Sequence, residues 1–247
     1  MNNPLTDIEK EFIYKYPTTR TKELIKNLGI KPSLANSYIQ RFRLKKEKTY
    51  KRSGDEEKIE VFTDRTKLGY FSGLIASDGS ISSREPNRVV IRLHINDLDV
   101  VRSMSMEFLG KDKVGVYPNG NSKCAIFSSS LPKFSEHLKS IGVLSRKTYN
   151  MSLTLPEDEG YRLGFLRGFI DGDGHVNESR KRIEIVSYLE SPLKELLLIS
   201  GSGKISVHSK KYHKLTLSRQ VAALLPVEDY MMSRKNSAIR LLLHHTP

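Results

Sequence analysis

The chain contains a long internal repeat, and this duplication restricts the fold more than any other feature of the sequence. The segment LGYFSGLIASDG (68–79) aligns without a gap with LGFLRGFIDGDG (163–174), at a constant spacing of 95 residues. A second match, Ser-Arg-Lys at 145–147 and again at 233–235, has a spacing of 88, so the second copy is seven residues shorter. A unit of about 90 residues is too long for a solenoid repeat and is typical of a duplicated domain. Identical pairs in the first match are Leu68 and Leu163, Gly69 and Gly164, Gly73 and Gly168, Ile75 and Ile170, Asp78 and Asp173, and Gly79 and Gly174.

Each copy is predicted to fold as helix, two strands, helix, two strands and helix. The first copy has strand patterns near 81–83 and 89–95 and a hairpin signal at Asn119-Gly120, with helices capped by Asn96 or Asp97 and by Ser130. The second has strand patterns near Val176 and over 182–188, a helix from Ser191 and a hairpin over 204–217. We therefore expect an α+β fold with one repeat over 63–155 and the other over 156–247.

Glycine recurs at four-residue spacing in the helix that opens each copy, so these small residues share one helix face. Each glycine costs a helix roughly 1 kcal/mol relative to alanine, and close packing of two backbones is the simplest way to offset that cost. Because the copies are equivalent, each helix is predicted to pack against the other around a pseudo-two-fold axis. The small residues are Gly69, Gly73 and Ser77 in one helix and Gly164, Gly168 and Gly172 in the other.

This packing brings the carboxylates of Asp78 and Asp173 together at the ends of the two helices. The two charges repel each other and also lie at negative helix ends, and a bound divalent cation relieves both effects. Oxygen-only ligation favours Mg²⁺ or a similar hard ion over zinc. A lone Asp-Gly is usually a turn, but duplication favours the metal site. A calcium loop at 171–182 is excluded, because Val176 and Arg182 occupy its glycine and glutamate positions.

The segments GLIASDG and GFIDGDG resemble the paired signature helices of LAGLIDADG homing endonucleases of the single-chain, two-repeat kind, and the resemblance covers roughly residues 65–247. It implies two pseudosymmetric αββαββα halves that form a DNA-binding saddle and cleave both strands of a long DNA site, as in intron homing. The last acidic residue of each signature helix holds metal in this family, and those positions are Asp78 and Asp173 here. We expect Mg²⁺ or Mn²⁺, with Ca²⁺ able to occupy the site without supporting cleavage.

The resemblance also assigns roles to three further residues. The first copy has Ala76 where the second has Asp171, and we expect Asp171 to be a helix-end or accessory residue. The family commonly places one lysine from each half beside the scissile phosphates, and Lys147 and Lys235 match these positions. An ammonium group there stabilises the pentacovalent phosphate or lowers the pKa of the attacking water. A solvated surface position is the alternative for either lysine.

The charge balance supports a nucleic-acid partner. The chain has 41 Lys and Arg against 28 Asp and Glu, a net charge of +13, although a basic surface without DNA would give the same balance. No acid occurs over 113–135 or 196–227, the windows that contain the two hairpins. The expected DNA contacts in the repeats are Arg84, Arg88, Arg92, His94, Tyr117, Asn119, Asn121, Lys123, Arg180, Arg182, Lys204, His208, Lys210, Lys211, Tyr212, His213 and Lys214. Most should contact phosphates rather than bases.

Residues 1–45 resemble a helix-turn-helix module, with Gly29 at the end of the second helix and a polar third helix. We predict a small all-α DNA-binding module, for which a plain three-helix packing module is the alternative. Its expected DNA contacts are Ser33, Asn36, Ser37, Gln40, Arg41 and Arg43. Residues 46–62 are highly charged and are predicted to form a linker, or else a solvated helix.

Other function classes fit the sequence less well. There is no apolar stretch of 18 residues and no signal-like start, so we expect a cytoplasmic protein without a membrane partner. The single cysteine excludes an internal disulfide and a Cys-rich zinc site. The leading hypothesis is a monomeric, site-specific endonuclease for double-stranded DNA with a long asymmetric target. The alternative is an RNA maturase or a DNA-binding regulator that uses the same fold without cleavage.

Overall fold

The computed structural model describes residues 57–58, 60–85, 87–145 and 147–244. The expected helix-turn-helix module and its six DNA-binding candidates lie outside these residues. The two repeats belong to one compact unit, Glu56–Pro247. None of the helices in the described part of the chain has the length and apolar character that crossing a bilayer requires.

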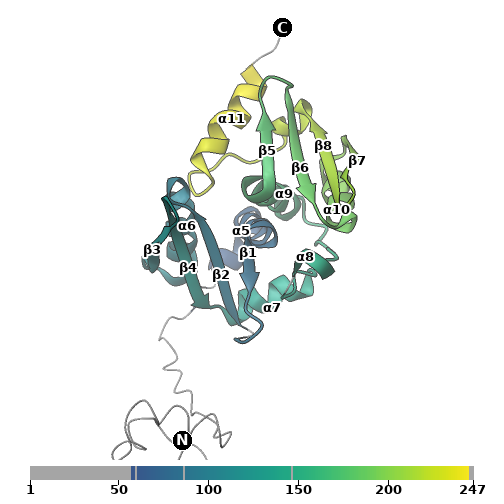
Figure 1. Ribbon diagram of the computed structural model, residues 1–247. Helices are drawn as coiled ribbons and strands as arrows, with labels where there is room; N and C mark the ends of the chain where they lie inside the picture. Colours follow the sequence, from purple (N-terminus) through teal and green to yellow (C-terminus); the bar gives the residue numbers. More distant parts are fainter. Residues whose placement is uncertain (1–56, 59, 86, 146, 245–247) are drawn as a thin grey trace, which may run out of the picture. The chain divides into compact units, whose positions relative to one another are not determined.

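Both repeats have the predicted order of elements (Figure 1). The first consists of α5 (Arg65–Ser77), β1 (Gly79–Ile81), β2 (Arg88–His94), the short turn η1 (Ile95–Asp97), α6 (Leu98–Leu109), β3 (Val114–Asn119), β4 (Ser122–Ser130) and α7 (Pro132–Ser140). The second consists of α9 (Glu159–Asp173), β5 (Gly174–Asn177), β6 (Arg182–Ser187), α10 (Glu190–Ser200), β7 (Gly203–Ser209), β8 (Tyr212–Ser218), η2 (Arg219–Ala223) and α11 (Ser233–His244). The short helices α4 (Glu60–Thr63) and α8 (Lys147–Asn150) precede α5 and α9. The α+β, two-repeat prediction is confirmed.

Each repeat contains one four-stranded antiparallel sheet, and the two strand orders correspond. They are β1-β2-β4-β3 and β5-β6-β8-β7. Ile91 of β2 pairs with Gly79 and Phe127, and Ile185 of β6 pairs with Gly174 and Leu215, so the registers correspond as well. One face of each sheet is buried, and α5 and α9 run between the two sheets (Figure 1). The opposite face, which we call the outer face, is available for contacts.

The glycine faces of α5 and α9 pack directly against each other, as predicted. A Cβ atom added to Gly73 would lie 2.1 Å from the carbonyl oxygen of Phe165, and one added to Gly168 would lie 2.0 Å from that of Tyr70. Gly69 and Gly164 make the same close approach to carbonyl oxygens of the other helix. No side chain fits between backbones this close, so glycine is required at these positions.

The amino-terminal boundary of the first repeat differs from the prediction. Ser130 does not cap α7, which instead begins at Pro132. The Glu57 carboxylate accepts the backbone N–H groups of Lys133 at 2.8 Å and Phe134 at 2.7 Å, and so satisfies free donors of the first turn. Val61 in α4 is buried. The end of the expected linker is therefore folded onto the first repeat.

The seven-residue length difference between the repeats divides among three connections. The difference in residue number between equivalent positions is 95 before the β1–β2 turn and 94 after it. It is 91 after η1 and 88 after the β3–β4 turn. The equivalent pairs are Gly79 and Gly174, Ile91 and Ile185, the left-handed helix caps Gly110 and Gly201, and Phe127 and Leu215. The three residues of η1 therefore have no counterpart in the second repeat.

We predict that Gly168→Ala destabilises the protein by about 3 kcal/mol or more, because the added methyl group meets the backbone of α5 and the two helices must separate. Gly160→Ala, in the same helix, is the matched control. Its Cβ would lie 2.9 Å from the Thr66 hydroxyl, which can rotate away. Urea unfolding of both variants measures the difference, and equal stability of the two would contradict the packing argument.

Candidate metal and nucleic-acid site

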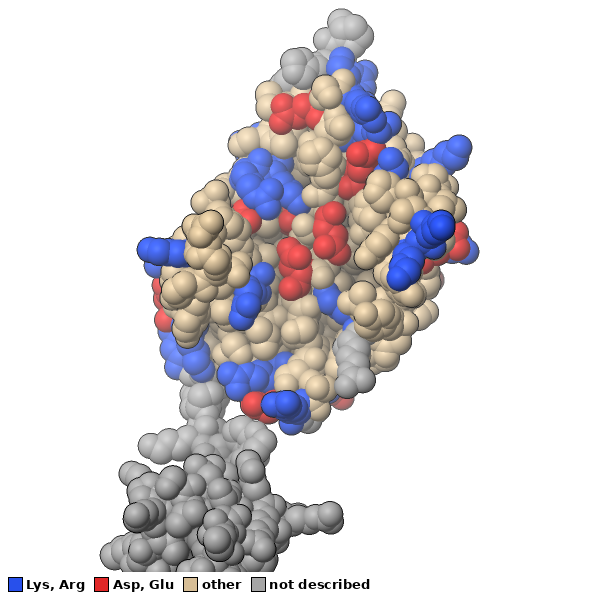
Figure 2. All heavy atoms as spheres, viewed as in Figure 1, with Lys and Arg blue, Asp and Glu red and all other residues tan. Residues whose placement is uncertain are grey.

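Asp78 and Asp173 lie where the two packed helices end. Asp78 is the residue directly after α5, and Asp173 is the last residue of α9. A Cβ atom added to Gly172, the neighbour of Asp173, would lie 3.3 Å from the carboxyl carbon of Asp78. Both acids are exposed, and acidic side chains gather at the centre of the face in Figure 2, with Lys and Arg around them. The helix packing therefore brings the two acids together at one surface.

The surroundings raise the pKa of both carboxyl groups. Desolvation by the adjoining protein is the main cause at Asp78, and the nearby Asp97 charge adds to it. At Asp173, desolvation is again the main cause, and the Asp78 charge adds to it. The ammonium groups of Lys147 and Lys235 oppose the shift at both positions. A divalent cation would stabilise the ionised pair further, and two carboxylates are ligands that fit a hard ion such as Mg²⁺.

Lys147 and Lys235 close the carboxyl-terminal ends of α5 and α9. The Lys147 ammonium donates to the carbonyl oxygens of Ile75 at 2.7 Å, Ala76 at 2.6 Å and Ser77. The Lys235 ammonium binds the corresponding end of α9, and its acceptors are the carbonyl oxygens of Ile170 at 2.6 Å, Asp171 at 2.7 Å, Gly172 at 3.4 Å and Gly174 at 2.7 Å. The equivalent positions predicted from the Ser-Arg-Lys repeat thus make equivalent contacts.

The contacts to helix carbonyls limit the ability of Lys147 and Lys235 to bind a phosphate directly. An ammonium group has three N–H donors, and here they point to carbonyl oxygens that a helix end leaves without partners. Burial lowers the pKa of each lysine to about 8, although nearby aspartates oppose the shift. The lysines hold the helix ends and place positive charge beside the two acids. A direct phosphate contact would require one of these bonds to be exchanged.

Asp171 has a different environment from the two exposed acids. Its carboxylate accepts from Arg167 at 3.0 and 3.3 Å, from the Tyr70 hydroxyl at 2.9 Å and from the Met232 N–H at 3.0 Å. The side chains of Arg167 and Asp171 are both 0% exposed. Asp171 therefore links α9 to α5 and to the start of α11. The residues equivalent to Arg167 and Asp171 in the first repeat are Ser72 and Ala76, so that repeat lacks this ion pair.

Strand register decides which expected DNA contacts share the outer faces of the sheets. Nine strand residues alternate onto these faces, namely Arg88, Arg92, His94, Tyr117, Asn119, Arg182, Lys204, Tyr212 and Lys214. Lys123 and His213 fall on the opposite alternation, with the buried faces. His208 lies at an irregularity between Val207 and Ser209. The remaining candidates lie in the turns between strands, namely Arg84, Asn121, Arg180, Lys210 and Lys211.

The outer faces also include residues that the sequence analysis missed. Glu184 faces outward and forms ion pairs with Arg182 at 2.5 Å and Lys214 at 3.4 Å, so it neutralises part of the second sheet. His175 and Asn177 share this face on β5. Alternation from Val176, which is partly buried against the core, was the signal that could have identified them, because both neighbours of an inward-facing strand residue face outward.

Comparison with known proteins supports the resemblance over part of the chain. Residues 160–221, within the second repeat, match the model of the LAGLIDADG-like domain. No curated protein matches the chain.

Several solved structures are similar to this chain at low identity. The structure of I-DmoI in complex with DNA and Ca is 16% identical, covers 72% of this chain and 98% of its own, and has a TM-score of 0.47. I-SmaMI bound to an uncleaved DNA target with calcium ions is 15% identical, with coverages of 71% and 90% and a TM-score of 0.43. Full-length DUF199/WhiA from Thermatoga maritima is 17% identical, with coverages of 74% and 62% and a TM-score of 0.49.

We predict that substitution of two neighbouring aspartates has different effects on the stability of the metal-free protein. Asp171→Asn leaves the Arg167 guanidinium buried without its counter-charge and should cost about 3–5 kcal/mol. Asp173→Asn removes a carboxylate whose charged form is disfavoured and should leave stability unchanged or increase it. Thermal unfolding in EDTA measures both. A large loss of stability in Asp173→Asn would contradict the inference that the ionised Asp173 carboxylate destabilises the metal-free fold.

Proposed function

We propose that this protein is a metal-dependent, site-specific endonuclease for double-stranded DNA, with Mg²⁺ or Mn²⁺ held by Asp78 and Asp173. The observation that carries the proposal is the pairing of two exposed acids at the ends of glycine-packed helices, between two sheets with basic residues on their outer faces. Purely structural acids would be expected to have ion-pair partners, as Asp171 does.

The residues around the acids suit phosphodiester hydrolysis. A divalent cation at this position would act as a Lewis acid and activate a water molecule. The carboxylates of Asp78 and Asp173, one from each repeat, would hold it. Lys147 and Lys235 fix the helix ends that carry these carboxylates, and their charge favours a phosphate beside the acids.

The two sheets suit binding to a duplex. Antiparallel ribbons fit the major groove of DNA, and the pseudo-two-fold relation between the repeats would let each sheet contact one half of a long site. The side chains on the two outer faces differ, because Arg92 and His94 are equivalent to Val186 and Tyr188. An asymmetric target follows from this difference. Since one chain supplies both repeats, a monomer would suffice.

We predict that Asp78→Asn and Asp173→Asn each abolish cleavage of at least one strand while leaving affinity for the target within a few-fold of wild type. The reason is that each change removes a metal ligand but no DNA-contacting group. The target is recovered by selection for binding in Ca²⁺ from a random duplex library, and strand cutting of that duplex in Mg²⁺ or Mn²⁺ is compared with its binding in Ca²⁺. Undiminished cutting by both variants would exclude the assignment. Specific binding by wild type without any cutting would support the maturase or regulator instead.

We further propose that residues 1–45 form a helix-turn-helix arm that binds DNA beyond the saddle, joined by a linker within 46–62. Deleting residues 1–55 leaves Glu57 and its contacts to α7 in place. Footprinting of the full chain and of this truncation should show a shorter protected region for the truncation. An identical footprint would reduce the arm to a structural appendage.

A further inference from the structure

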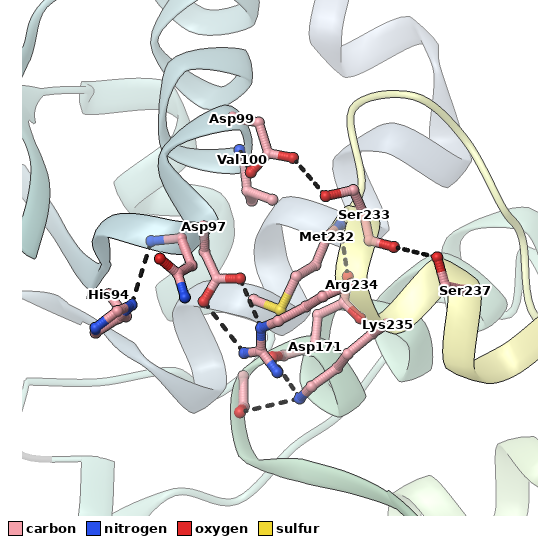
Figure 3. Close-up of polar contacts among 12 residues, drawn as sticks. His94, Asp97, Asp99, Val100, Asp171, Met232, Ser233, Arg234, Lys235 and Ser237 are labelled. Atoms are coloured by element: carbon pink, nitrogen blue, oxygen red, sulfur yellow. Dashed lines mark hydrogen bonds and ion pairs between the residues drawn. The ribbon is translucent and has the colours of Figure 1, made fainter. Parts of the chain in front are cut away.

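One ion pair joins the two repeats beside Asp78, and among the described residues it is found on one flank of the site. Asp97, on the three-residue turn η1 of the first repeat, is 4% exposed. Its carboxylate accepts two hydrogen bonds from the Arg234 guanidinium, from Nε at 2.7 Å and from Nη2 at 3.1 Å. Arg234 lies at the start of α11 in the second repeat (Figure 3). The contact therefore connects the two repeats through residues that are 137 positions apart in the sequence.

The neighbouring residues strengthen the same junction. The Ser233 hydroxyl donates to the Asp99 carboxylate at 2.9 Å, so two consecutive residues of α11 hold the end of η1 and the start of α6. The next residue, Lys235, binds the end of α9. Figure 3 shows these side chains converging from the two repeats. The guanidinium thus has a fixed position next to the helix ends that carry the acids.

Arg234 keeps the capacity to bind an anion. Its bond to Asp97 uses two of five N–H donors, and the side chain is 53% exposed. Its charge reaches Asp78, because Arg234 is among the groups that lower the pKa of this carboxyl against the opposing effect of burial. A planar guanidinium held on one edge by a buried carboxylate presents its other edge in a fixed orientation, which suits a phosphate.

In the part of the chain that the structure describes, the other flank of the site is built differently; Arg146, the residue equivalent to Arg234, lies outside that part. Because η1 has no counterpart in the second repeat, no residue there corresponds to Asp97. Tyr188 occupies the position equivalent to His94, one residue before Leu189, the N-cap of α10. The centroid of its ring lies 5.6 Å from that of Tyr149 in α8. An exposed aromatic contact thus joins the repeats there, where a buried carboxylate joins them on the first flank.

We propose that Arg234 binds a DNA phosphate on the Asp78 flank and that Asp97 is the positioning residue that orients it, so that the two strands are cut with unequal dependence on this pair. The inference rests on the proposed function, and it assigns to Arg234 and Asp97 a role on one strand. Asp97 does not touch DNA in this scheme. It acts through the guanidinium that it holds.

The first test measures phosphate contact without cleavage. Binding of the full chain to the selected duplex in Ca²⁺ is measured across salt concentrations for wild type, Arg234→Gln and Asp99→Asn. Loss of one phosphate contact should lower the slope of log affinity against log salt by about 1 in Arg234→Gln. Asp99→Asn is the matched control, because it removes a nearby carboxylate that binds Ser233 instead of Arg234. An unchanged slope in Arg234→Gln would overturn the phosphate contact.

The second test follows each strand separately in Mg²⁺ on a duplex with a different label on each strand. Arg234→Gln and Asp97→Asn should slow one strand about tenfold more than the other, the effect of losing one charge-assisted hydrogen bond, so that nicked duplex accumulates. Arg234→Lys should not restore the rate, because an ammonium cannot reproduce the planar fork. Asp99→Asn should cut both strands at the wild-type ratio.

The outcomes separate the two proposals. Equal slowing of both strands, with the salt slope unchanged, would make the ion pair a structural link and overturn the inference while the endonuclease stands. A wild-type protein that binds DNA but cuts neither strand would overturn the proposed function, and the strand-specific role with it. The salt slope on a duplex selected for binding would then decide the phosphate contact by itself.

Discussion

The contact between the backbones of α5 and α9 is the constraint on which the rest of the structure depends. Four glycines let each helix approach carbonyl oxygens of the other at distances that would exclude a Cβ atom. This approach fixes the helices in matching register, so that both end at the same surface. The position of Asp78 beside Asp173 follows from that register, and so do the placements of the two sheets on either side.

At the ends of α5 and α9, two acidic and two basic side chains lie together, and the surroundings disfavour the charged form of each. Two acids with raised pKa lie next to two lysines with lowered pKa. The acids occupy equivalent positions in the two repeats, and so do the lysines. The lysines satisfy carbonyl groups that the helices leave open, which stabilises the very ends that present the acids. Structural and electrostatic roles therefore coincide in the same pair of side chains.

The sequence predicted the fold well because the repeat, the glycine spacing and the strand alternation are periodic signals. It did not predict the lysine contacts to helix carbonyls, the buried Arg167–Asp171 pair or the Asp97–Arg234 bridge. Each of these joins residues brought together by the tertiary packing, without a local pattern that marks them. Residue type alone also could not show that Tyr117 lies on the outer face of the sheet whereas Lys123 falls on the opposite alternation. The strand register shows which face a hairpin residue occupies.

The buried Arg167–Asp171 pair depends on residues that differ between the two repeats. Its third partner, the Tyr70 hydroxyl, comes from the first repeat, and the residue equivalent to Tyr70 in the second repeat is Phe165. In a symmetric homodimer of second repeats, each Asp171 carboxylate would lie beside Phe165, which has no hydroxyl. In a homodimer of first repeats, the Tyr70 hydroxyl would lie beside Ala76, which has no carboxylate. The contact among Tyr70, Asp171 and Arg167 therefore needs both repeats as they stand, because neither repeat contains all three side chains.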